Sequence, residues 1–507
     1  MLSMPTRLLF SVLAILAHPT VAKAVSRDTL FITSEAPTAE TADCLKSSYY
    51  GAFGGSSTQQ DHIYLPPKEC LSDRSTLSGF KEGRIAPLES DDQSRLVWVG
   101  QAGLDGQGDG SLRMENDNWL LISGQIEQWM AGTDLESAEN QYILQSASAY
   151  HKRPITLVHQ TSNSLLLDVP PAFLPILDTF LPRHLVPVAL PSKPLPVTAT
   201  GWEPVPDKFA RHLANITSHL QFSPEIDTIV SEGINLNRIR RDVRWITGEA
   251  PSGIVSRHSF TPSAVKAAHW IKSKVEVTGA SCSLQPFLHG FAPNVICEYP
   301  SLSNSTERVI FSAHYDSRGS FGSTRAPGGN DDGSGLGHLL SLAHAIGSYG
   351  IKFDKAVTLA WFAGEEQGLF GSHAYAEYLH SQNATILLQV QADMIAYHAP
   401  GEPSQLALPE IIHLPEASYL VGNLSQMYSP ELVVGKTSAC CSDHQSFISY
   451  GFPATQVFER NGPIADPMYH NSGDITQREG YDFEQVVSFA KVTLATLLTV
   501  AGYHVAK

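Results

Sequence analysis

Positively charged residues are scarce in this chain. Its 507 residues include 34 lysines and arginines against 50 aspartates and glutamates, which gives a formal net charge of −16. Proteins that bind nucleic acids use basic patches to neutralise phosphates, so this charge balance argues against a nucleic-acid partner. Solubility is a sufficient explanation for the acidic excess.

Long apolar runs are also missing after the first 24 residues. Every later segment of transmembrane length contains charged or turn-forming residues. Residues 1–24 combine a basic start at Arg7, an apolar run over 8–17 and the small-residue sequence Ala22-Lys23-Ala24. The run is well short of the roughly 20 residues that a membrane anchor, the alternative, would need. We therefore predict a cleaved signal peptide and a secreted, extracellular protein without a membrane partner.

Cysteine is rare, with six residues in the chain. In an oxidising compartment, proximity in the sequence favours disulfides between Cys44 and Cys70 and between Cys282 and Cys297. The adjacent pair at 440–441 leaves open a vicinal disulfide or two free thiols, and a zinc thiolate site is less favoured without a matching pair elsewhere. Four acceptor sequences for N-glycosylation predict a glycoprotein, at Asn215, Asn304, Asn383 and Asn423.

The length of the chain favours at least two folding units. Six prolines between positions 187 and 206 predict a stiff, extended connector. We therefore expect an N-terminal region over 25–185, a Pro-rich linker over 186–206 and a larger domain over 207–507. Strand-like runs at 96–99 and 119–122 predict a smaller, β-rich or α+β N-terminal region.

The larger domain begins with helical patterns, which Pro224 and Pro262 open as residues of a first helical turn. From about residue 282, β-rich runs alternate with helical patterns. This alternation predicts an α/β domain with a mostly parallel central sheet flanked by helices.

Two common hydrolase signatures are missing from the chain. The sequence contains no Gly-x-Ser-x-Gly segment, which argues against the serine hydrolases that use a nucleophile elbow. It also contains no His-Glu-x-x-His segment, so the thermolysin arrangement of zinc ligands is excluded.

Acidic and imidazole groups instead follow the predicted buried strands. His314 comes directly after the run 309–313, and Glu365 and Glu366 follow the run 357–362. Ligands gather at the carboxyl ends of strands in open α/β sheets. Two adjacent carboxylates repel each other where desolvation grows, and bound cations would relieve that cost.

Further candidates stand at equivalent places. Asp393 follows another strand-like run, and His470 lies in a loop after the last one. Asp331 lies in a glycine-rich segment where it could bridge two cations, although either it or Asp332 could instead cap the next helix. Asp316 could accept the second N–H of a metal-binding imidazole. Two histidines, three carboxylates and a spare glutamate fit a pair of zinc ions with a general base, which predicts hydrolysis by metal-activated water.

With these segments in order, the chain resembles the secreted di-zinc aminopeptidases of leucine-aminopeptidase type, relatives of glutamate carboxypeptidase and glutaminyl cyclase. The likeness covers roughly residues 210 to 505. By resemblance, two Zn²⁺ ions are the cofactors: His314 and Asp393 would bind one, Glu366 and His470 the other, and Asp331 would bridge both. Glu365 would be the general base, and Asp316 is the second catalytic candidate.

The resemblance implies a metallo-aminopeptidase that acts on the N-termini of peptides or proteins and favours bulky apolar first residues. A glutaminyl cyclase, which needs one zinc ion, and a carboxypeptidase, which would need cationic groups for the substrate carboxylate, are the alternatives. A receptor or scaffold without metals is disfavoured, since every ligand is retained. Residues 25–185 would then be a prosegment or accessory domain that covers the cleft.

The chain departs from the family pattern at one place. The family often has two cysteines four residues apart before Ser-Asp-His, but Thr437 stands at the earlier position here. A tyrosine that is common between those cysteines is replaced by Ala439. These departures put the usual local disulfide and one auxiliary group in doubt.

Overall fold

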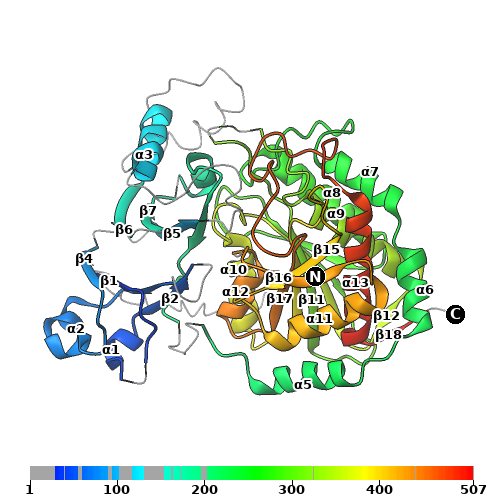
Figure 1. Cartoon of the computed structure of the whole chain (residues 1–507), viewed down its shortest axis with the longest axis horizontal. Coiled ribbons are helices and arrows are strands. Elements are labelled where there is room, and N and C mark those ends of the chain that lie inside the picture. Colours follow the sequence, from blue (N-terminus) through cyan, green and yellow to red (C-terminus); the bar gives the residue numbers. More distant parts are fainter. Residues whose placement is uncertain are drawn as a thin grey trace, which may run out of the picture.

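The computed structural model places a smaller β-rich part, formed by the N-terminal region, beside a larger α/β part (Figure 1). The predicted signal peptide lies outside the described residues and stays a prediction. The structure describes residues 29–38, 40–54, 60–88, 94–101, 117–130, 154–161, 164–171, 173–195, 202–321, 323, 325–439 and 441–505.

The larger part is built on a six-stranded sheet with the order β17-β14-β11-β13-β10-β9. The pairs β11–β13, β11–β14 and β14–β17 are parallel, while β10 pairs antiparallel with both β13 and β9. The predicted α/β fold with a mostly parallel sheet is therefore confirmed. The strands are β9 (Ser281–Gln285), β10 (Asn294–Tyr299), β11 (Glu307–His314), β13 (Ala356–Phe362), β14 (Thr385–Ala392) and β17 (Ala454–Val457).

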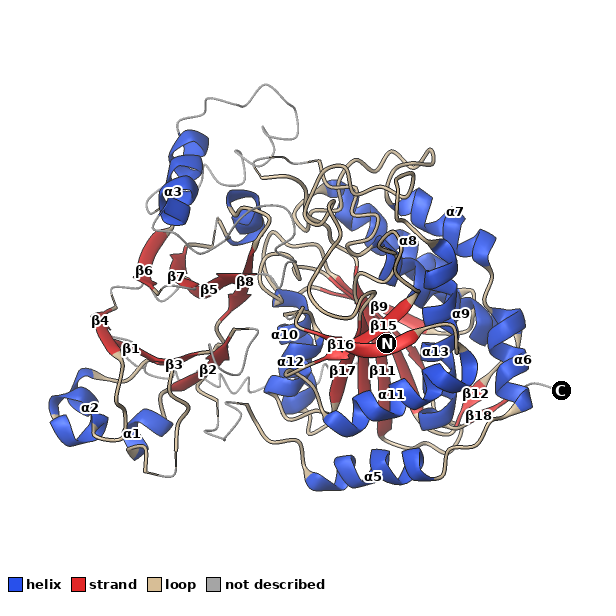
Figure 2. Cartoon of the chain, viewed as in Figure 1, coloured by secondary structure: helices blue, strands red, loops and turns tan. Residues whose placement is uncertain are grey.

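Side chains along these strands alternate between the two faces of the sheet, as the two-residue period of a strand requires. In β11, Val309 and Phe311 belong to the apolar cluster on one face, and Ile310 belongs to the cluster on the other. Helices cover both faces (Figure 2), so the central strands β11 and β13 are largely apolar and buried.

One face is covered mainly by the long helices that pack into the larger cluster. These are α5 (Asp207–Ser218), α6 (Pro224–Gly233), α7 (Leu236–Ile246), α8 (Pro262–Glu276), α9 (Gly333–Ser348), α11 (Pro415–Tyr428) and α13 (Phe483–Ala501). The proline-led starts expected at 224 and 262 are confirmed. In each of these two starts, the side chain before the proline caps the helix: Ser223 accepts from Ile226 N–H and Thr261 accepts from Ala264 N–H.

The other face is covered by α10 (Phe370–Ser381) and α12 (His444–Ser449), which lie between the central sheet and the N-terminal region (Figure 2). Their apolar cluster also contains Phe31, Tyr49 and Tyr64 from the N-terminal region. The two parts of the chain therefore share a continuous apolar contact.

Helix α13 is, within the described ranges, the one helix that is long and apolar enough to cross a membrane. However, 72% of its most apolar window is buried inside the protein. It packs against α9 and α11, which identifies it as a core helix of the larger part.

The N-terminal region forms two antiparallel sheets, with the orders β2-β3-β1-β4 and β6-β7-β5-β8. Short helices α1 (Asp43–Lys46), α2 (Lys68–Ser72) and α3 (Asp117–Met130) and the 3₁₀ segments η1 (Arg74–Leu77) and η2 (Leu174–Phe180) accompany them. The strands are β1 (Thr29–Thr33), β2 (Tyr49–Phe53), β3 (Asp61–Tyr64), β4 (Arg84–Pro87), β5 (Arg95–Gln101), β6 (Thr156–Gln160), β7 (Ser164–Val169) and β8 (Leu185–Ala189).

Smaller pairs of strands complete the larger part. The parallel pair consists of β15 (Gln405–Pro409) and β16 (Val433–Thr437). The antiparallel pair consists of β12 (Lys352–Phe353) and β18 (Tyr503–His504).

Two local expectations for the N-terminal region were wrong. The run 119–122 lies in helix α3 rather than in a strand, with Ile122 and Ile126 buried one turn apart. A short apolar run does not distinguish a buried strand from a helix, so its period had to be read over a longer window. Residues 186–189, the start of the expected connector, belong to β8, which pairs with β5. The division of the chain into domains otherwise stays a prediction.

The predicted disulfides Cys44–Cys70 and Cys282–Cys297 are confirmed. The second one joins β9 to β10 at directly paired positions. Cys441 is also disulfide-bonded, which excludes a free thiol there, and Cys440 lies outside the described residues.

Candidate metal centre and active site

The candidate site lies where the parallel strands end. His314 is the last residue of β11, Asp393 directly follows β14, and Glu365 and Glu366 stand in the loop after β13. His470 comes from the long loop after β17. Because parallel strands present their carboxyl ends at one edge of the sheet, these distant residues meet there.

Asp331 occupies the centre of the group. Its Oδ1 lies 3.1 Å from Nε2 of His314, and its Oδ2 lies 3.3 Å from Nε2 of His470. Asp393 Oδ1 is 3.6 Å from Nε2 of His314, and Glu366 Oε2 is 3.1 Å from Nε2 of His470. The structure therefore brings all five expected metal ligands together, with Asp331 between the two imidazoles.

The neighbouring Asp332 has a different role. It is the N-cap of α9, where its Oδ1 accepts the N–H of Gly335 at 2.9 Å and that of Met394 at 3.2 Å. Of the two aspartates that the sequence left open, Asp332 is thus the capping residue. Two groups of three ligand atoms, each within 4.8 Å of one another, are formed by His314, Asp332 and Asp393 and by Asp331, Glu366 and His470. We regard Asp331 as the better shared ligand, because its two oxygens face both imidazoles while one oxygen of Asp332 is engaged in the cap.

The donor set fits divalent cations. Within the described part of the chain, Glu366 Oε1 and Asp332 Oδ2 are buried and have no hydrogen-bond partner. Burial raises the pKa of Glu365 well above its usual value, and Asp393 and Glu366 add to this effect. Burial alone would lower the pKa of His314, yet Glu365 and Asp393 outweigh it and raise that pKa well above its usual value. Such concentrated negative charge needs compensation, and carboxylate and imidazole ligands are typical of zinc.

Asp316 supports these residues from behind the pocket. Its Oδ1 lies 3.5 Å from Nδ1 of His314, and its two oxygens accept the N–H groups of Glu365 and Glu366 at 3.4 and 3.3 Å. Ser259 donates a hydrogen bond to it at 3.0 Å. This placement favours a positioning role for Asp316, and a direct part in catalysis stays a prediction.

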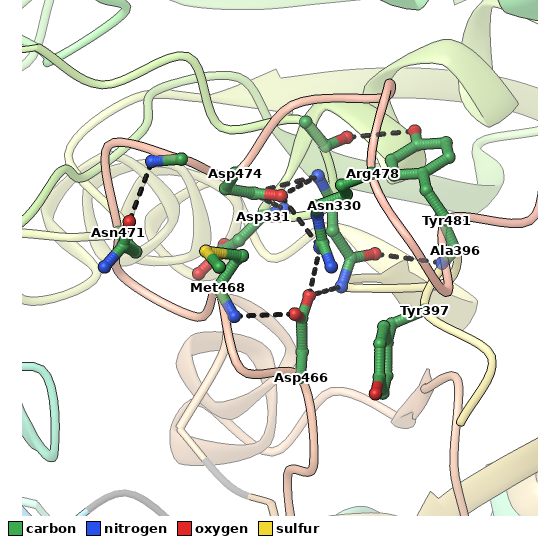
Figure 3. A network of polar contacts seen from close by, with 12 residues as sticks. Asn330, Asp331, Ala396, Tyr397, Asp466, Met468, Asn471, Asp474, Arg478 and Tyr481 are labelled. Atoms are coloured by element: carbon green, nitrogen blue, oxygen red, sulfur yellow. Dashed lines mark hydrogen bonds and ion pairs between the residues drawn. The ribbon is translucent and has the colours of Figure 1, made fainter. Parts of the chain in front are cut away.

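Asp474, four residues after His470, holds the backbone around Asp331 (Figure 3). Its carboxylate accepts the N–H of Asp331 at 3.0 Å and that of the preceding residue at 3.0 and 2.9 Å. Arg478 donates to Asp474 at 3.0 Å and is also paired with Asp466. Burial and the charge of Asp466 raise the pKa of Asp474 to about 7, against the opposing effect of Arg478. The network fixes the main chain that presents the central aspartate.

A pocket with an empty volume of about 470 Å³ opens over the site. The pocket is lined by Glu365 and by all five expected metal ligands except His314. Lysine and arginine are absent from its described lining residues. Most of its apolar lining comes from one small apolar cluster of the larger part, which contributes Met394, Ala439, Phe458, Ile464 and Tyr469.

Sequence reasoning placed the N-terminal region over the cleft but missed the particular residues that reach this pocket. Val186 and Pro187 of β8 line it together with the metal-ligand candidates. It also missed Arg318, a buried residue whose Nη1 lies 2.8 Å from Nδ1 of His470. The sequence did offer a signal for Arg318, because it is a cation four residues after His314 in a chain with few cations. It offered no such signal for Val186 and Pro187.

An α/β sheet with carboxylates and imidazoles gathered at the carboxyl ends of its parallel strands is typical of metal-dependent hydrolases. Comparison with known families narrows this class. The sequence model of peptidase family M28 matches residues 294–495. The chain is 30% identical over 254 residues to a probable leucine aminopeptidase of Arthroderma otae, an alignment that covers 47% of this chain and 67% of that protein.

The chain belongs to peptidase family M28. It is therefore a zinc-dependent metalloexopeptidase, and the expected family resemblance is confirmed. It is also 26% identical over 291 residues to leucine aminopeptidase 1 of Emericella nidulans, covering 53% of this chain and 72% of that protein. The structure of the LapA aminopeptidase of Legionella pneumophila has the same fold, with a TM-score of 0.54 at 20% identity over 70% of this chain and 96% of that chain.

Proposed function

We propose that this protein is a secreted aminopeptidase that removes single residues, with a preference for bulky apolar ones, from the free N-termini of peptides. The main support is the position of Asp331, whose two oxygens face the imidazoles of His314 and His470. That arrangement suits two zinc ions, with Asp393 completing one ligand group and Glu366 the other. The similarity to leucine aminopeptidases supports the reaction class.

The residues divide the reaction between them. Zinc bound at this site would polarise the scissile carbonyl and acidify a water molecule. Glu365, which lines the pocket beside the ligands, would take the proton from the attacking water and deliver it to the leaving nitrogen. Asp316 would keep both Glu365 and His314 in place through the contacts described above.

The lining of the pocket supports an aminopeptidase over a carboxypeptidase. A carboxypeptidase needs a cationic group for the terminal carboxylate of its substrate, and the described lining residues include neither lysine nor arginine. The carboxylates of the pocket suit a protonated amine instead. The apolar side chains of Met394, Phe458 and Ile464 offer contacts to the first side chain of the substrate.

Substrate pairs that differ at one end test the proposal. We expect hydrolysis of leucyl-4-nitroanilide and leucyl peptides, and at least 10²-fold slower hydrolysis of N-acetylated leucyl substrates, on the scale of a lost specific contact. Metal analysis of the same enzyme should give two zinc ions per chain. Shortening of peptides from the carboxyl end would favour a carboxypeptidase. Cyclisation of N-terminal glutamine with one zinc ion would favour a glutaminyl cyclase, and no turnover at all would favour a receptor or scaffold.

Secretion and glycosylation are parts of the same proposal. The four asparagines in acceptor sequences are all exposed, as glycosylation requires. Culture medium from an expressing host should contain the enzyme without residues 1–24. Treatment with an N-glycosidase should lower its mass, and an unchanged mass would contradict glycosylation.

A further inference from the structure

The 181–187 segment of the N-terminal region runs along the loop that carries His470. The guanidinium of Arg318, which is 3% exposed, donates to three carbonyl oxygens of this segment. The distances are 2.9 Å to Leu185, 2.6 Å to Leu181 and 3.1 Å to Pro182. A buried cation of the larger part is thus solvated by the backbone of the N-terminal region.

The same segment also contacts the loop of His470 directly. Nδ1 of His470 lies 3.2 Å from the carbonyl oxygen of Arg183, and the guanidinium of Arg183 donates to the carbonyl oxygen of Pro467 at 3.1 Å. The Arg183 carbonyl pairs with Nδ1 only in the tautomer that carries hydrogen there, whereas the Arg318 guanidinium, which lies 2.8 Å from the same nitrogen, pairs with the other tautomer.

A second buried arginine shows what is unusual about Arg318. Arg257 is fully buried as well, and its guanidinium donates to carbonyl oxygens of Ile246, Tyr315, Pro327 and Gly328, all from the larger part. The carbonyl acceptors of Arg318 in the described structure all come from the N-terminal region. Without that region, Arg318 would keep its charge beside His470 and lose these acceptors, which is a costly state for a buried cation.

The 181–187 segment is held firmly as it enters the pocket. Val186 and Pro187 are paired through β8 with Gly100 and Val99 of β5. Just beyond them, Ala189 donates its N–H to the carbonyl oxygen of Gly368 at 3.2 Å. The side chain of Val186 packs against an apolar cluster that contains residues of both parts, among them Trp98, Val188, Leu369 and Cys441.

We propose that the N-terminal region is a permanent part of the active enzyme, and that Val186 and Pro187 form a wall that limits the size of the substrate side chain. A removable inhibitory segment would leave a complete site when it departs, whereas Arg318 and the pocket wall depend on residues 181–187. The inference rests on the proposed aminopeptidase function and adds the residues that set its selectivity.

Two variants of Val186 test the wall. In the full-length secreted enzyme, we measure kcat/KM for alanyl, leucyl and naphthylalanyl 4-nitroanilides. Val186→Ala should raise the naphthylalanyl-to-alanyl ratio about tenfold, which is the scale of one methylene group in an apolar pocket. Val186→Phe should lower that ratio by a similar factor, and the alanine variant decides the question if the phenylalanine variant fails to fold.

Val158→Ala is the matched control. Val158 of β6 is a partly buried valine that packs against the same apolar cluster as Val186, but it is not among the residues that line the pocket. Its removal should leave the ratio unchanged. The proposed wall would be wrong if both alanine variants shifted the naphthylalanyl-to-alanyl ratio equally. It would also be wrong if Val186→Ala left this ratio unchanged while the wild type remains active.

Whether the active enzyme retains the N-terminal region is tested by mass spectrometry. Intact mass and peptide mapping of the active chromatographic fraction should find residues 29–195, either continuous with the rest or still bound to it. An active fraction without these residues would overturn the proposal and would leave the aminopeptidase assignment intact. Conversely, equal cleavage of N-acetylated substrates, or absence of turnover, removes the proposed function and this inference with it.

Discussion

The two parts of this protein contribute different kinds of groups to one pocket. The larger part supplies the charged side chains, such as Asp331, Glu365 and His470. The N-terminal region supplies the apolar residues Val186 and Pro187 to the pocket, and its main-chain carbonyl oxygens contact Arg318 and His470. Chemistry and shape are thus encoded in separate stretches of sequence, so substitutions in the two parts should have different consequences.

The difference is also visible in what holds each part in place. The network of Asp474 and Arg478 lies within the larger part and fixes the main chain at Asp331. The N-terminal region is attached through a buried pair, in which Asp178 of η2 lies 2.7 Å from His258 of the larger part. The first network should control the metal, and the second should control whether the two parts stay together.

The largest effect is expected from removing the general base. Glu365→Gln keeps the size of the side chain but removes its ability to accept a proton, so kcat should fall by about 10²- to 10⁴-fold while the zinc content is unchanged. Steady-state kinetics and metal analysis measure the two quantities. Glu377→Gln, in α10 and away from the pocket lining, is the control and should retain full turnover. Wild-type turnover in Glu365→Gln would show that chemistry does not reside there.

The buried pair between the two parts comes next. Asp178→Asn leaves His258 without its carboxylate in a position that is 2% exposed, so the free energy of unfolding should fall by about 3 kcal/mol. Denaturant titration measures the loss. Removing the exposed pair of Lys193 and Glu377, which joins the same two parts at 3.4 Å, should cost less than about 1 kcal/mol. Equal losses would mean that burial does not distinguish the two contacts.

A smaller effect is expected from the network beneath Asp331. Asp474→Asn replaces an acceptor of two N–H groups and of Arg478 by a neutral amide, so zinc affinity should fall about 10- to 100-fold. Competition with a chelator gives the dissociation constants. Asp482→Asn, at the cap of α13, should leave them unchanged because asparagine is an equally good cap. Unaltered affinity in Asp474→Asn would limit this network to a structural role.

The smallest effect concerns pH and the N-terminal region. Burial lowers the pKa of His62 to about 4, and its Nδ1 is hydrogen-bonded to the hydroxyl of Tyr49 at 2.9 Å. The unfolded chain takes up this proton at its usual pKa near 6.5, so stability falls as the pH drops from about 6.5 towards 4. Between pH 7 and 5.5, His62 should account for about 1 kcal/mol of the fall in the free energy of unfolding. The His62→Gln variant should lack this contribution. The matched control is His504→Gln, at an exposed position, which should keep the wild-type dependence of stability on pH. Equal pH slopes for the wild type and His62→Gln would show that His62 does not cause this dependence.

Much of the larger part could be read from the sequence because its signals are local. Apolar runs marked the buried strands, and the charged residues directly after them marked the edge where ligands bind. His314, Glu366 and Asp393 are positioned by the strand that precedes each of them, so the chain order alone predicted their meeting. The positions of Ser223 and Thr261 before a proline marked two helix starts in the same way.

The remaining features depend on contacts between distant segments. Asp474 is four residues from His470, yet it bonds to the main chain of Asp331, because the fold of the loop decides which backbone groups need an acceptor. The run 119–122 was read as a strand because four apolar residues do not reveal a period. Val186 is an ordinary strand residue by sequence, and its place in the pocket follows from how the second N-terminal sheet packs against the loops after β13 and β16.

The sequence by itself determined the class of fold and the residues able to hold cations, because strand periodicity and desolvated charge act over a few neighbouring residues. Tertiary structure alone decided that the N-terminal region solvates Arg318 and that Val186 and Pro187 line the pocket. A backbone carbonyl or a valine carries no mark of its partner, and its role arises only when packing brings distant parts of the chain together.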